Sequence, residues 1–423
     1  MFTRPKGLKK MSLGLVAVGL SLALLLTAAI PVCEAGPADK VVKVGLFTGF
    51  TGPLASTGIP LSYGLIDAID YTNEQGGING VKVEALWEDT KGLVPGNLSA
   101  YKRFKDAGVV EVMQISSGPI DVLGPMVARD KIPMVVVATH CRGAVTRPLS
   151  WTIGGGLDLG SYVATILKWI GEEWTEDRPP RVGFFTYDLA TGWQFMEGVQ
   201  YAKDFGVENI GHELTSITVI DTTVEWLRLR AKEPDFILMY LAGMAIVTAI
   251  KDAARLGLEE QGIKLIEFLT LDEFILPMVG KDAERWHVFR NYPSQIETEE
   301  FPGLKVIIDA GKRYRGWERG EICATYIATW VEAVVGMEGI RLAIEKVGLE
   351  NLTPPDVREA LVSIRDFDTG IVPPITITND RPFTSRLVKL YQIREGVIQP
   401  CTGPIEPFFD HFDQLIKEGI IVE

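Results

Sequence analysis

The chain has 423 residues, of which 47% are apolar and 23% are charged. This composition is typical of a globular protein and excludes disordered, collagen-like and coiled-coil chains. The 55 acidic residues outnumber the 42 basic ones, which leaves a net charge of −13. Because nucleic acids are recognised through a basic surface, this acidic balance argues against a nucleic-acid partner.

The first 35 residues have the pattern of a secretory signal. Three lysines at positions 6, 9 and 10 precede an uncharged stretch from Met11 to Val32, which Cys33-Glu34-Ala35 follows. A basic head, an apolar run and small residues at the end predict cleavage after Ala35, so residues 1–35 are a signal peptide. The apolar run is also long enough to span a bilayer, which leaves an uncleaved anchor as an alternative. In both cases the body is predicted to lie in the periplasm or elsewhere outside the cytoplasm.

Behind this segment, apolar β-type runs alternate with helical patterns. The first four strands are expected at residues 41–47, 81–87, 109–115 and 132–138, with helices around 61–72, 98–104 and 116–129 between them. The strands read as continuous apolar runs, which indicates strands covered on both faces of a parallel sheet.

The same alternation starts again after a glycine-rich stretch at residues 151–160, which we interpret as a flexible crossing. Strands are expected at residues 182–187, 210–214, 235–241 and 263–269, and helices at 193–205, 222–232 and 245–256. Later helical stretches at 301–314, 323–347 and 356–363 and a strand at 387–392 are too few for a third sheet domain. They are therefore expected to complete the two existing units.

Motifs for catalysis, metals and cofactors are absent from the sequence. The four histidines lie far apart, without an HExxH motif, a CxxC motif or a Cys/His cluster, so neither a metal site nor a cofactor is predicted. No GxSxG elbow or phosphate-binding loop occurs. His140 and Cys141 are adjacent, which is a poor arrangement for a nucleophile and its base. The odd number of cysteines left after cleavage (Cys141, Cys323 and Cys401) leaves their pairing open. We therefore predict that the protein is not an enzyme.

Binding chemistry remains, and it is expected where strands end. In open α/β sheets, ligands bind beyond the carboxyl ends of the strands. Residues Ser116–Gly118 also precede a helix, whose free N–H groups and dipole favour an anion, although plain helix capping is an equally good interpretation. Asp272 and Glu273 follow an apolar strand, so at least one carboxylate is expected at the rim of the cleft, as a partner for a ligand cation. The candidate ligand-binding residues are Phe50, Thr51, Ser116, Ser117, Ala138, Thr139, His140, Tyr187, Thr191, Ala242, Asp272 and Glu273.

Two motifs carry a resemblance to a known family. The segment from Thr51 to Gly58 reads TGPLASTG, and the segment from Asn73 to Gly80 reads NEQGGING. Together with Glu88-Asp89 they resemble the type I periplasmic solute-binding proteins, of the Leu/Ile/Val-binding type that serves branched-chain amino-acid ABC transporters. The resemblance covers about residues 40–392.

The resemblance implies two doubly wound, Rossmann-like α/β lobes joined by a three-stranded hinge. Lobe I is expected at 36–157 and 290–384, and lobe II at 158–289 and 385–423, the latter with a C-terminal extension. In the family a serine hydroxyl and backbone N–H groups hold the ligand carboxylate, and Ser117 matches that serine. Ala138 and His140 match the next positions, with histidine in place of the family's threonine. Thr191 and Ala242 stand at positions of aromatic residues, and the acid that holds the ligand ammonium falls near Asp272 or Glu273.

These expectations favour a solute-binding receptor of an ABC importer. It is expected to act as a monomer that captures a small amino-acid-like or carboxylate solute by hinge closure and delivers it to a membrane permease. Because the two aromatic walls are missing, the pocket is expected to take something larger than a branched-chain amino acid. Two alternatives stay open: a ligand-sensing module for a signalling partner, and an exported amidase or hydrolase.

Overall fold

The computed structural model describes residues 40–137, 151–379, 381–409 and 413–414. From Lys40 onward the chain forms one compact unit. The predicted signal peptide, residues 1–35, lies outside the described residues. Within the described part of the chain, no helix is both long and apolar enough to cross a bilayer.

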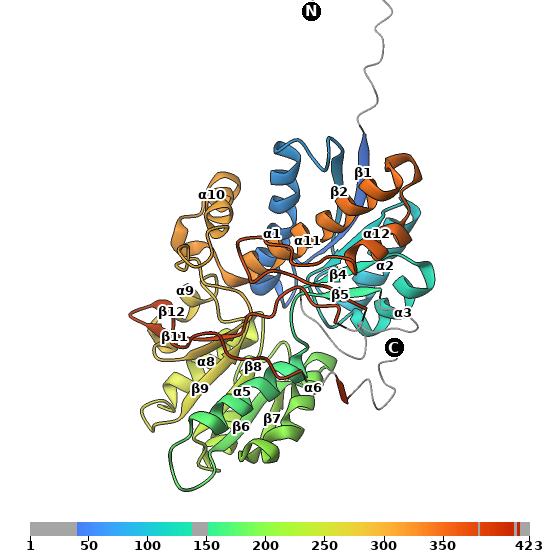
Figure 1. The fold of residues 1–423 in the computed structure, drawn as a ribbon. Coiled ribbons are helices and arrows are strands. Elements are labelled where there is room, and N and C mark those ends of the chain that lie inside the picture. Colours follow the sequence, from blue (N-terminus) through green and yellow to red (C-terminus); the bar gives the residue numbers. More distant parts are fainter. Residues whose placement is uncertain (1–39, 138–150, 380, 410–412, 415–423) are drawn as a thin grey trace, which may run out of the picture. The chain divides into compact units, whose positions relative to one another are not determined.

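Five parallel strands form the first sheet, in the order β2-β1-β3-β4-β5 (Figure 1). Their bounds are β1 Val41–Thr48, β2 Lys82–Asp89, β3 Glu111–Gln114, β4 Met134–Val136 and β5 Thr152–Gly154. The strand order reverses next to β1, which is the switch point where doubly wound sheets bind their ligands.

Helices cover both faces of this sheet. One hydrophobic core joins the sheet to four helices: α1 Ala55–Glu74, α10 Leu304–Arg315, α11 Ala324–Val347 and α12 Pro354–Leu361. A second core on the other face includes residues of α2 Val94–Asp106 and α3 Ile120–Asp130. The β-branched runs of the strands are thus buried on both sides, as their continuous apolar pattern predicts.

The second sheet repeats the strand order of the first and adds two strands. Its order is β12-β11-β10-β9-β8-β6-β7. The strands β6 to β10 run parallel, β11 pairs antiparallel with β10, and β12 pairs antiparallel with β11. The strands are β6 Arg181–Tyr187, β7 Glu208–Thr215, β8 Phe236–Tyr240, β9 Lys264–Phe268, β10 His287–Arg290, β11 Lys389–Arg394 and β12 Val397–Pro400. Its helices are α5 Leu159–Glu173, α6 Ala190–Glu197, α7 Thr223–Arg230, α8 Met244–Arg255 and α9 Leu276–Val279. Short 3-10 helices add η1 Gly198–Phe205, η2 Gly280–Ala283, η3 Arg319–Glu321 and η4 Leu349–Asn351.

The chain passes three times between the sheets, and the three passages are bonded to one another. Gly154 pairs with Phe383 in a parallel bridge, and the Thr384 N–H donates to the Gly154 carbonyl at 2.8 Å. The Ser385 hydroxyl donates to the carbonyl of Asn291 at 2.9 Å, which ties the third passage to the second. The prediction of two doubly wound α/β units with a three-stranded connection is therefore confirmed.

The structure differs from the sequence-based expectation where elements are short. Residues 152–154 form β5, a buried edge strand, whereas the sequence predicts only a crossing at 151–160. The strands β10 and β12 are four residues each and show no periodicity long enough to detect. The helix α1 begins at Ala55, earlier than the helix that the sequence predicts around 61–72. These differences matter because β10 leads directly into the candidate site.

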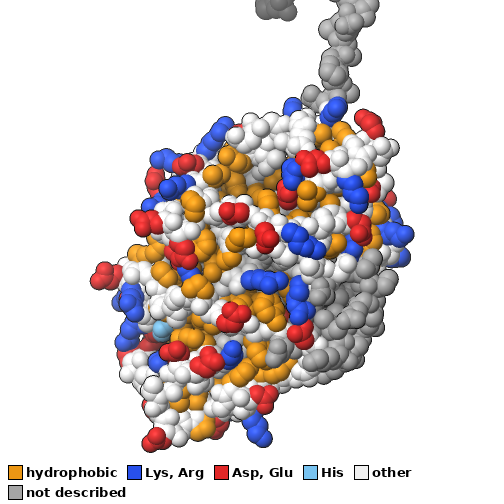
Figure 2. All heavy atoms as spheres, in the orientation of Figure 1, with side chains coloured by type: hydrophobic (Ala, Val, Ile, Leu, Met, Phe, Trp, Pro, Cys, Tyr) orange, Lys and Arg blue, Asp and Glu red, His pale blue; other side chains and the backbone are white. Residues whose placement is uncertain are grey.

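The surface carries both signs of charge side by side. Figure 2 shows acidic and basic side chains interspersed over the face drawn. Some of them form exposed ion pairs, such as Arg103 with Glu88 at 2.6 Å and Arg178 with Asp235 at 2.6 Å. Exposed pairs of this kind contribute less than about 1 kcal/mol each. These surface pairs therefore contribute little to the stability of the fold.

Candidate functional site

A cavity of about 340 Å³ lies where loops of the two sheets face each other. It is lined by residues that follow β1, β3, β6, β8, β9 and β10, which places it beyond the carboxyl ends of parallel strands. Most of the lining side chains are apolar. They include Leu54, Leu61, Leu93, Val94, Ile115, Val137, Leu189, Ile217 and Leu269. A mostly apolar cavity with a few polar groups is the usual form of a small-molecule site.

We call the lining residues of the first sheet and its helices the first wall. Its polar groups are Ser116, Ser117 and Gly118 after β3, Thr57 on α1 and Thr325 on α11. The Ser116 N–H donates to the side chain of Gln114 at 3.0 Å. By contrast, the N–H groups of Ser117 and Gly118 donate no hydrogen bond to any residue in the described ranges. They lie just before α3, so the first wall offers free donors at a helix N-terminus.

We call the lining residues that follow β6, β8 and β9 the second wall. Its polar side chains are mostly bonded to the protein itself. The Tyr187 hydroxyl donates to the carbonyl of Ala242 at 2.5 Å, and the Thr270 N–H donates to buried Glu267 at 3.0 Å. Burial raises the pKa of Glu267 to about 8, although its hydrogen bonds from Thr270 and Leu271 oppose this shift. Tyr240 reaches across to the first wall, where it is hydrogen-bonded to Ser117.

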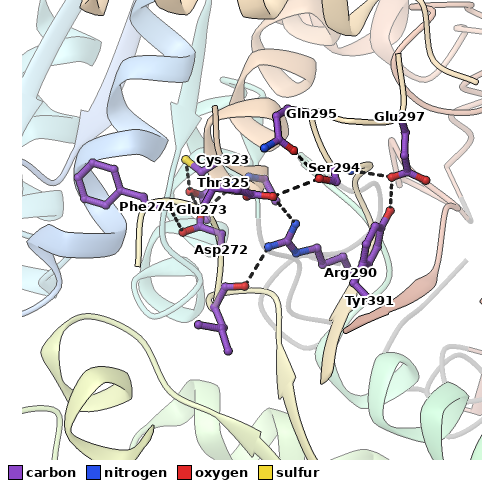
Figure 3. Close-up of polar contacts among 12 residues, drawn as sticks. Asp272, Glu273, Phe274, Arg290, Ser294, Gln295, Glu297, Cys323, Thr325 and Tyr391 are labelled. Carbon is purple, nitrogen blue, oxygen red and sulfur yellow. Dashed lines mark hydrogen bonds and ion pairs between the residues drawn. The ribbon is translucent and has the colours of Figure 1, made fainter. Parts of the chain in front are cut away.

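Arg290, at the end of β10, is a buried cation on the cavity lining, with 1% of its surface exposed. Its Nη1 donates to Glu273 at 3.1 Å and its Nη2 to the Leu271 carbonyl at 2.9 Å (Figure 3). Burial opposes the charged form, yet Glu273 and Asp272 raise the pKa of Arg290 above its ordinary value. The Nε of Arg290 has no hydrogen-bond partner among the described residues. This nitrogen is itself enclosed by protein, so the guanidinium mainly ties the cavity lining to Glu273 and Leu271.

The two acids that precede Arg290 in the chain are satisfied by the protein. Asp272 accepts the N–H of Phe274 at 3.0 Å and the Thr325 hydroxyl at 2.5 Å. Glu273 accepts Arg290, the Ser294 hydroxyl at 3.2 Å and the N–H of Ala324 at 3.2 Å (Figure 3). Asp272 is 1% exposed and Glu273 is 7% exposed. Both carboxylates thus bind the N-terminal turn of α11, a helix of the other sheet.

A buried glutamate joins the passages between the sheets at the back of the cavity. Glu332 on α11 accepts the Tyr292 hydroxyl at 2.7 Å and the Thr384 hydroxyl at 3.0 Å. The Tyr292 hydroxyl also lies against the carbonyl of Gly155. Burial raises the pKa of Glu332 to about 8. All three passages therefore meet around one side chain that holds a proton at neutral pH.

The structure brings five of the predicted site residues to the cavity. These are Ser116, Ser117, Tyr187, Thr191 and Ala242. Phe50 and Thr51 lie outside its lining, where the Thr51 hydroxyl donates to Asp89 at 2.6 Å and the Phe50 N–H donates to the same carboxylate at 3.1 Å. Ala138, Thr139 and His140 lie outside the described residues.

Asp272 and Glu273 differ from the expectation that a carboxylate reaches the rim of the cleft. Neither belongs to the cavity lining, because both side chains turn to α11 and Arg290 instead. Sequence reasoning also missed Tyr240, Arg290, Asn291 and Tyr292, which line the cavity. Arg290 is the last residue of β10, Asn291 and Tyr292 come directly after it, and this strand is too short to predict. A charged residue directly after Val288 and Phe289, in the tetrapeptide His-Val-Phe-Arg, was the available signal.

The described residues offer no arrangement for a metal ion. No group of three or more His, Cys, Asp or Glu side chains converges within these ranges. Cys323 and Cys401, the two cysteines that the structure describes, are both free thiols. Cys323 is buried at the start of α11, where burial raises its pKa well above the ordinary value, which makes the thiol a poor nucleophile.

Several solved structures share this architecture. Among solved structures, a branched-chain amino acid ABC transporter protein from Thermus thermophilus with bound valine has a TM-score of 0.79 at 18% identity, over 89% of this chain and 99% of that chain. A solute-binding protein from R. palustris in complex with 4-hydroxybenzoate has a TM-score of 0.72 at 18% identity, over 87% and 97%. A fatty acid ABC transporter substrate-binding protein from Thermomonospora curvata has a TM-score of 0.73 at 16% identity, over 90% and 95%. At these identities the likeness shows the fold alone.

The sequence itself points to the same group of proteins. No curated protein matches the chain. The model of the periplasmic binding protein family, however, matches residues 41–405, which include every described strand and helix from β1 to β12. The chain therefore belongs to the periplasmic binding protein family.

Proposed function

We propose that this protein is the extracytoplasmic solute-binding receptor of an ABC importer, which captures a small amino-acid-like or carboxylate solute and delivers it to a membrane permease. The observation that carries the proposal is the apolar cavity between the two sheets, on whose first wall the N–H groups of Ser117 and Gly118 donate to no described residue. The family and the solute-binding proteins among its structural neighbours support this role. The receptor performs no chemistry on the solute.

Contacts across the cavity suggest how capture works. The Gly243 N–H, which follows β8, donates to the Thr57 hydroxyl on α1 at 3.0 Å. The backbone of Gly243 also packs against Pro53 and Leu54, because a Cβ there would lie 2.3 Å from the Pro53 oxygen. A solute that touches both walls adds to these contacts and favours the closed arrangement. In our proposal, the permease recognises this closed arrangement.

The signal-like segment at residues 1–35 supports export to the compartment where such receptors work. Cleavage after Ala35, or retention of the segment as an anchor, places the same body outside the cytoplasm. N-terminal sequencing of the protein from its native host distinguishes the two outcomes, since a cleaved protein begins at Gly36.

A thermal-shift screen tests the proposed function. The purified protein is heated with amino acids, aromatic acids, amides and short dicarboxylates, and each hit is then titrated calorimetrically. A solute that binds only the folded state raises the melting temperature. At a hundredfold excess over Kd it adds about 2.7 kcal/mol to the free energy of unfolding. We expect one chemical class to bind with 1:1 stoichiometry and to be recovered unaltered. Recovery of a converted product, or a complete absence of binding across the panel, would contradict the receptor role.

A further inference from the structure

The chain after β12 runs back over the connection between the two α/β units. Its residues Ile405–Phe409 belong to neither sheet, and Figure 1 shows them in dark red next to α5. We call this stretch, together with Asp413, the C-terminal segment. The match to the family ends at residue 405, so most of the segment lies beyond it. Its contacts are therefore features of this chain that the family match does not cover.

The C-terminal segment is fastened to the second unit through Phe408. The Phe408 N–H donates to the Thr165 hydroxyl on α5 at 3.0 Å. The ring of Phe408 packs edge-on against Tyr201 and Phe205 of η1, at centroid distances of 5.0 and 5.1 Å. Edge-to-face pairs of this kind stabilise a contact beyond the apolar area that they bury. One end of the segment is thus held on α5 and η1.

The same segment also contacts the third passage between the sheets. The Cζ atoms of Arg386 and Arg381 lie over the ring of Phe409, at 5.6 and 5.9 Å from its centroid. Arg381 also forms an ion pair with Asp413. A cation within about 6 Å of an aromatic face is attracted to it. The segment therefore touches both ends of residues 382–385, the part of the third passage that is bonded to the other two.

The two arginines belong to different units. The Arg381 N–H donates to the Thr378 carbonyl at 3.3 Å, and the Thr378 N–H donates to the Arg381 carbonyl at 3.2 Å. Ile377, one residue earlier, is buried in the core of the first sheet. Arg386, by contrast, comes two residues before Val388, which is buried in the core of the second sheet. Contacts from one segment to both arginines therefore join the two units around their connection.

We propose that the C-terminal segment is a strap that limits the movement of the two units about the hinge. Phe408 fixes it to the second unit, while Phe409 and Asp413 hold Arg381 of the first. Hinge motion changes the separation of residues on opposite sides of a connection, so it strains or breaks these contacts. The strap is formed in the arrangement whose two walls are hydrogen-bonded across the cavity. This inference rests on the hinge closure of the proposed function and adds a restraint to it.

Small-angle X-ray scattering of the solute-free protein tests the strap without any solute. Asp413→Lys places a second cation beside Arg381, at a side chain that is 38% exposed, so it opens the strap and leaves both cores intact. We expect its radius of gyration to exceed that of the wild type. Glu176→Lys is the matched control, since it disrupts an exposed pair with Arg178 in the second unit, and it should leave the radius of gyration unchanged.

Two further variants show whether the contacts themselves are responsible. Arg381→Glu combined with Asp413→Lys restores an ion pair of reversed sense, so we expect the radius of gyration to return towards the wild-type value. Phe408→Ala releases the other end of the segment and should have the same effect as Asp413→Lys. If Phe408→Ala fails to fold, Asp413→Lys decides the question alone. A radius of gyration that is the same in Asp413→Lys and the wild type would overturn the strap.

Titration with a solute separates this inference from the proposed function. With the solute that the thermal-shift screen selects, Asp413→Lys should bind roughly threefold to tenfold more weakly, because a smaller fraction of the protein is in the closed arrangement. Unchanged affinity together with an unchanged radius of gyration would overturn the strap and leave the receptor function intact. If no member of the panel binds, the receptor function is contradicted, and the scattering comparison still decides the strap.

Discussion

The two walls of the cavity differ in what their polar groups are doing. On the first wall, the N–H groups of Ser117 and Gly118 have no partner in the described structure. On the second wall, Tyr187, Thr270 and the nearby Asp272 and Glu273 are bonded to protein atoms. A polar residue near a cavity is thus available to a ligand only when its own bonds are incomplete. Among the described residues, backbone donors without a protein partner therefore lie on the first wall, whereas the polar side chains of the second wall mainly bind other protein atoms.

The largest expected effect comes from Glu273→Gln, which breaks the buried pair with Arg290. Removal of one partner from a buried ion pair costs about 3–5 kcal/mol of unfolding free energy, because the other charge stays buried. We expect a loss of this size in chemical denaturation, with the selectivity between solutes that differ only in an amino group unchanged. Glu260→Gln is the control, since Glu260 is exposed and 4.0 Å from Arg285. Its loss should be below about 1 kcal/mol. Unchanged stability with altered amine selectivity would mean that Glu273 faces the ligand.

The burial of Glu332 predicts that stability depends on pH, because this side chain lies among hydroxyls and has no paired cation within the described part of the chain. Its pKa in the folded state, about 8, lies above the ordinary value of 4.5. The folded protein therefore holds a proton that the unfolded chain releases between these values. The contribution of Glu332 to the free energy of unfolding is fully present below pH 4.5. It is lost as the pH rises towards 8, by up to about 1.4 kcal/mol per pH unit for one such group. Over three pH units this amounts to roughly 4 kcal/mol.

Denaturation curves at pH 5, 6.5 and 8 measure this slope. Glu111 and Glu267, whose pKa values burial likewise raises to about 8, contribute in the same direction. In Glu332→Gln the hydroxyl contacts remain but the side chain no longer titrates. We therefore expect the slope of the unfolding free energy against pH to lose the contribution of about one proton. Glu350→Gln, at an exposed position, serves as the control. A slope identical in wild type and Glu332→Gln would show that Glu332 is ionised in the folded protein.

Gly243→Ala tests the contact that closes the two walls. Gly243 has φ 64° and ψ −145°, and an added Cβ would lie 2.3 Å from the Pro53 oxygen on the first wall. Gly280 is a matched control, since it has φ 56° and ψ −132° and no atom within 4 Å of an added Cβ. Both alanine variants should lose about 1–3 kcal/mol of stability to backbone strain. Only Gly243→Ala should weaken solute binding, by roughly a hundredfold or about 2.7 kcal/mol. Equal affinities for both variants would exclude this contact from the closed state.

The smallest effect is expected for Ser117→Ala on the first wall. Loss of one hydrogen bond to a charged ligand group costs about 1–3 kcal/mol, which corresponds to roughly a tenfold to hundredfold weaker Kd. Ser363→Ala is the control, because the Ser363 hydroxyl donates to the Ala360 carbonyl away from the cavity. Calorimetric titration with the best carboxylate measures both. An unchanged Kd for Ser117→Ala would remove the hydroxyl from the carboxylate site and leave the backbone donors alone there.

The same comparison explains how much of the site could be predicted from sequence. The position of Ser117 beside the cavity was predictable because the sequence shows a strand-like run at 109–115 before it and a helix start after it. The strand β10 has only four residues, so Arg290 at its end escaped prediction. The positions of Asp272 and Glu273 after a strand were also visible. Their occupation by Thr325 and Ala324, more than fifty positions away in the chain, was not, because partner choice depends on the tertiary fold.

The fold itself was more predictable than the site. The parallel sheets with helices on both faces follow from the alternation of apolar runs and helical patterns, since parallel strands need crossover connections. The exceptions, such as Thr152–Gly154, are strands held by neighbours on the sheet instead of by their own periodicity. Local sequence does not record that kind of support.

The most direct test of the account is small-angle X-ray scattering of the purified protein with and without the solute that the thermal-shift screen selects. If the two walls close on the solute, we expect the radius of gyration to fall when the solute is added. Gly243→Ala should abolish this change, whereas Gly280→Ala should preserve it. A radius of gyration that stays the same at saturating solute would contradict the claim that the two walls close on a captured molecule.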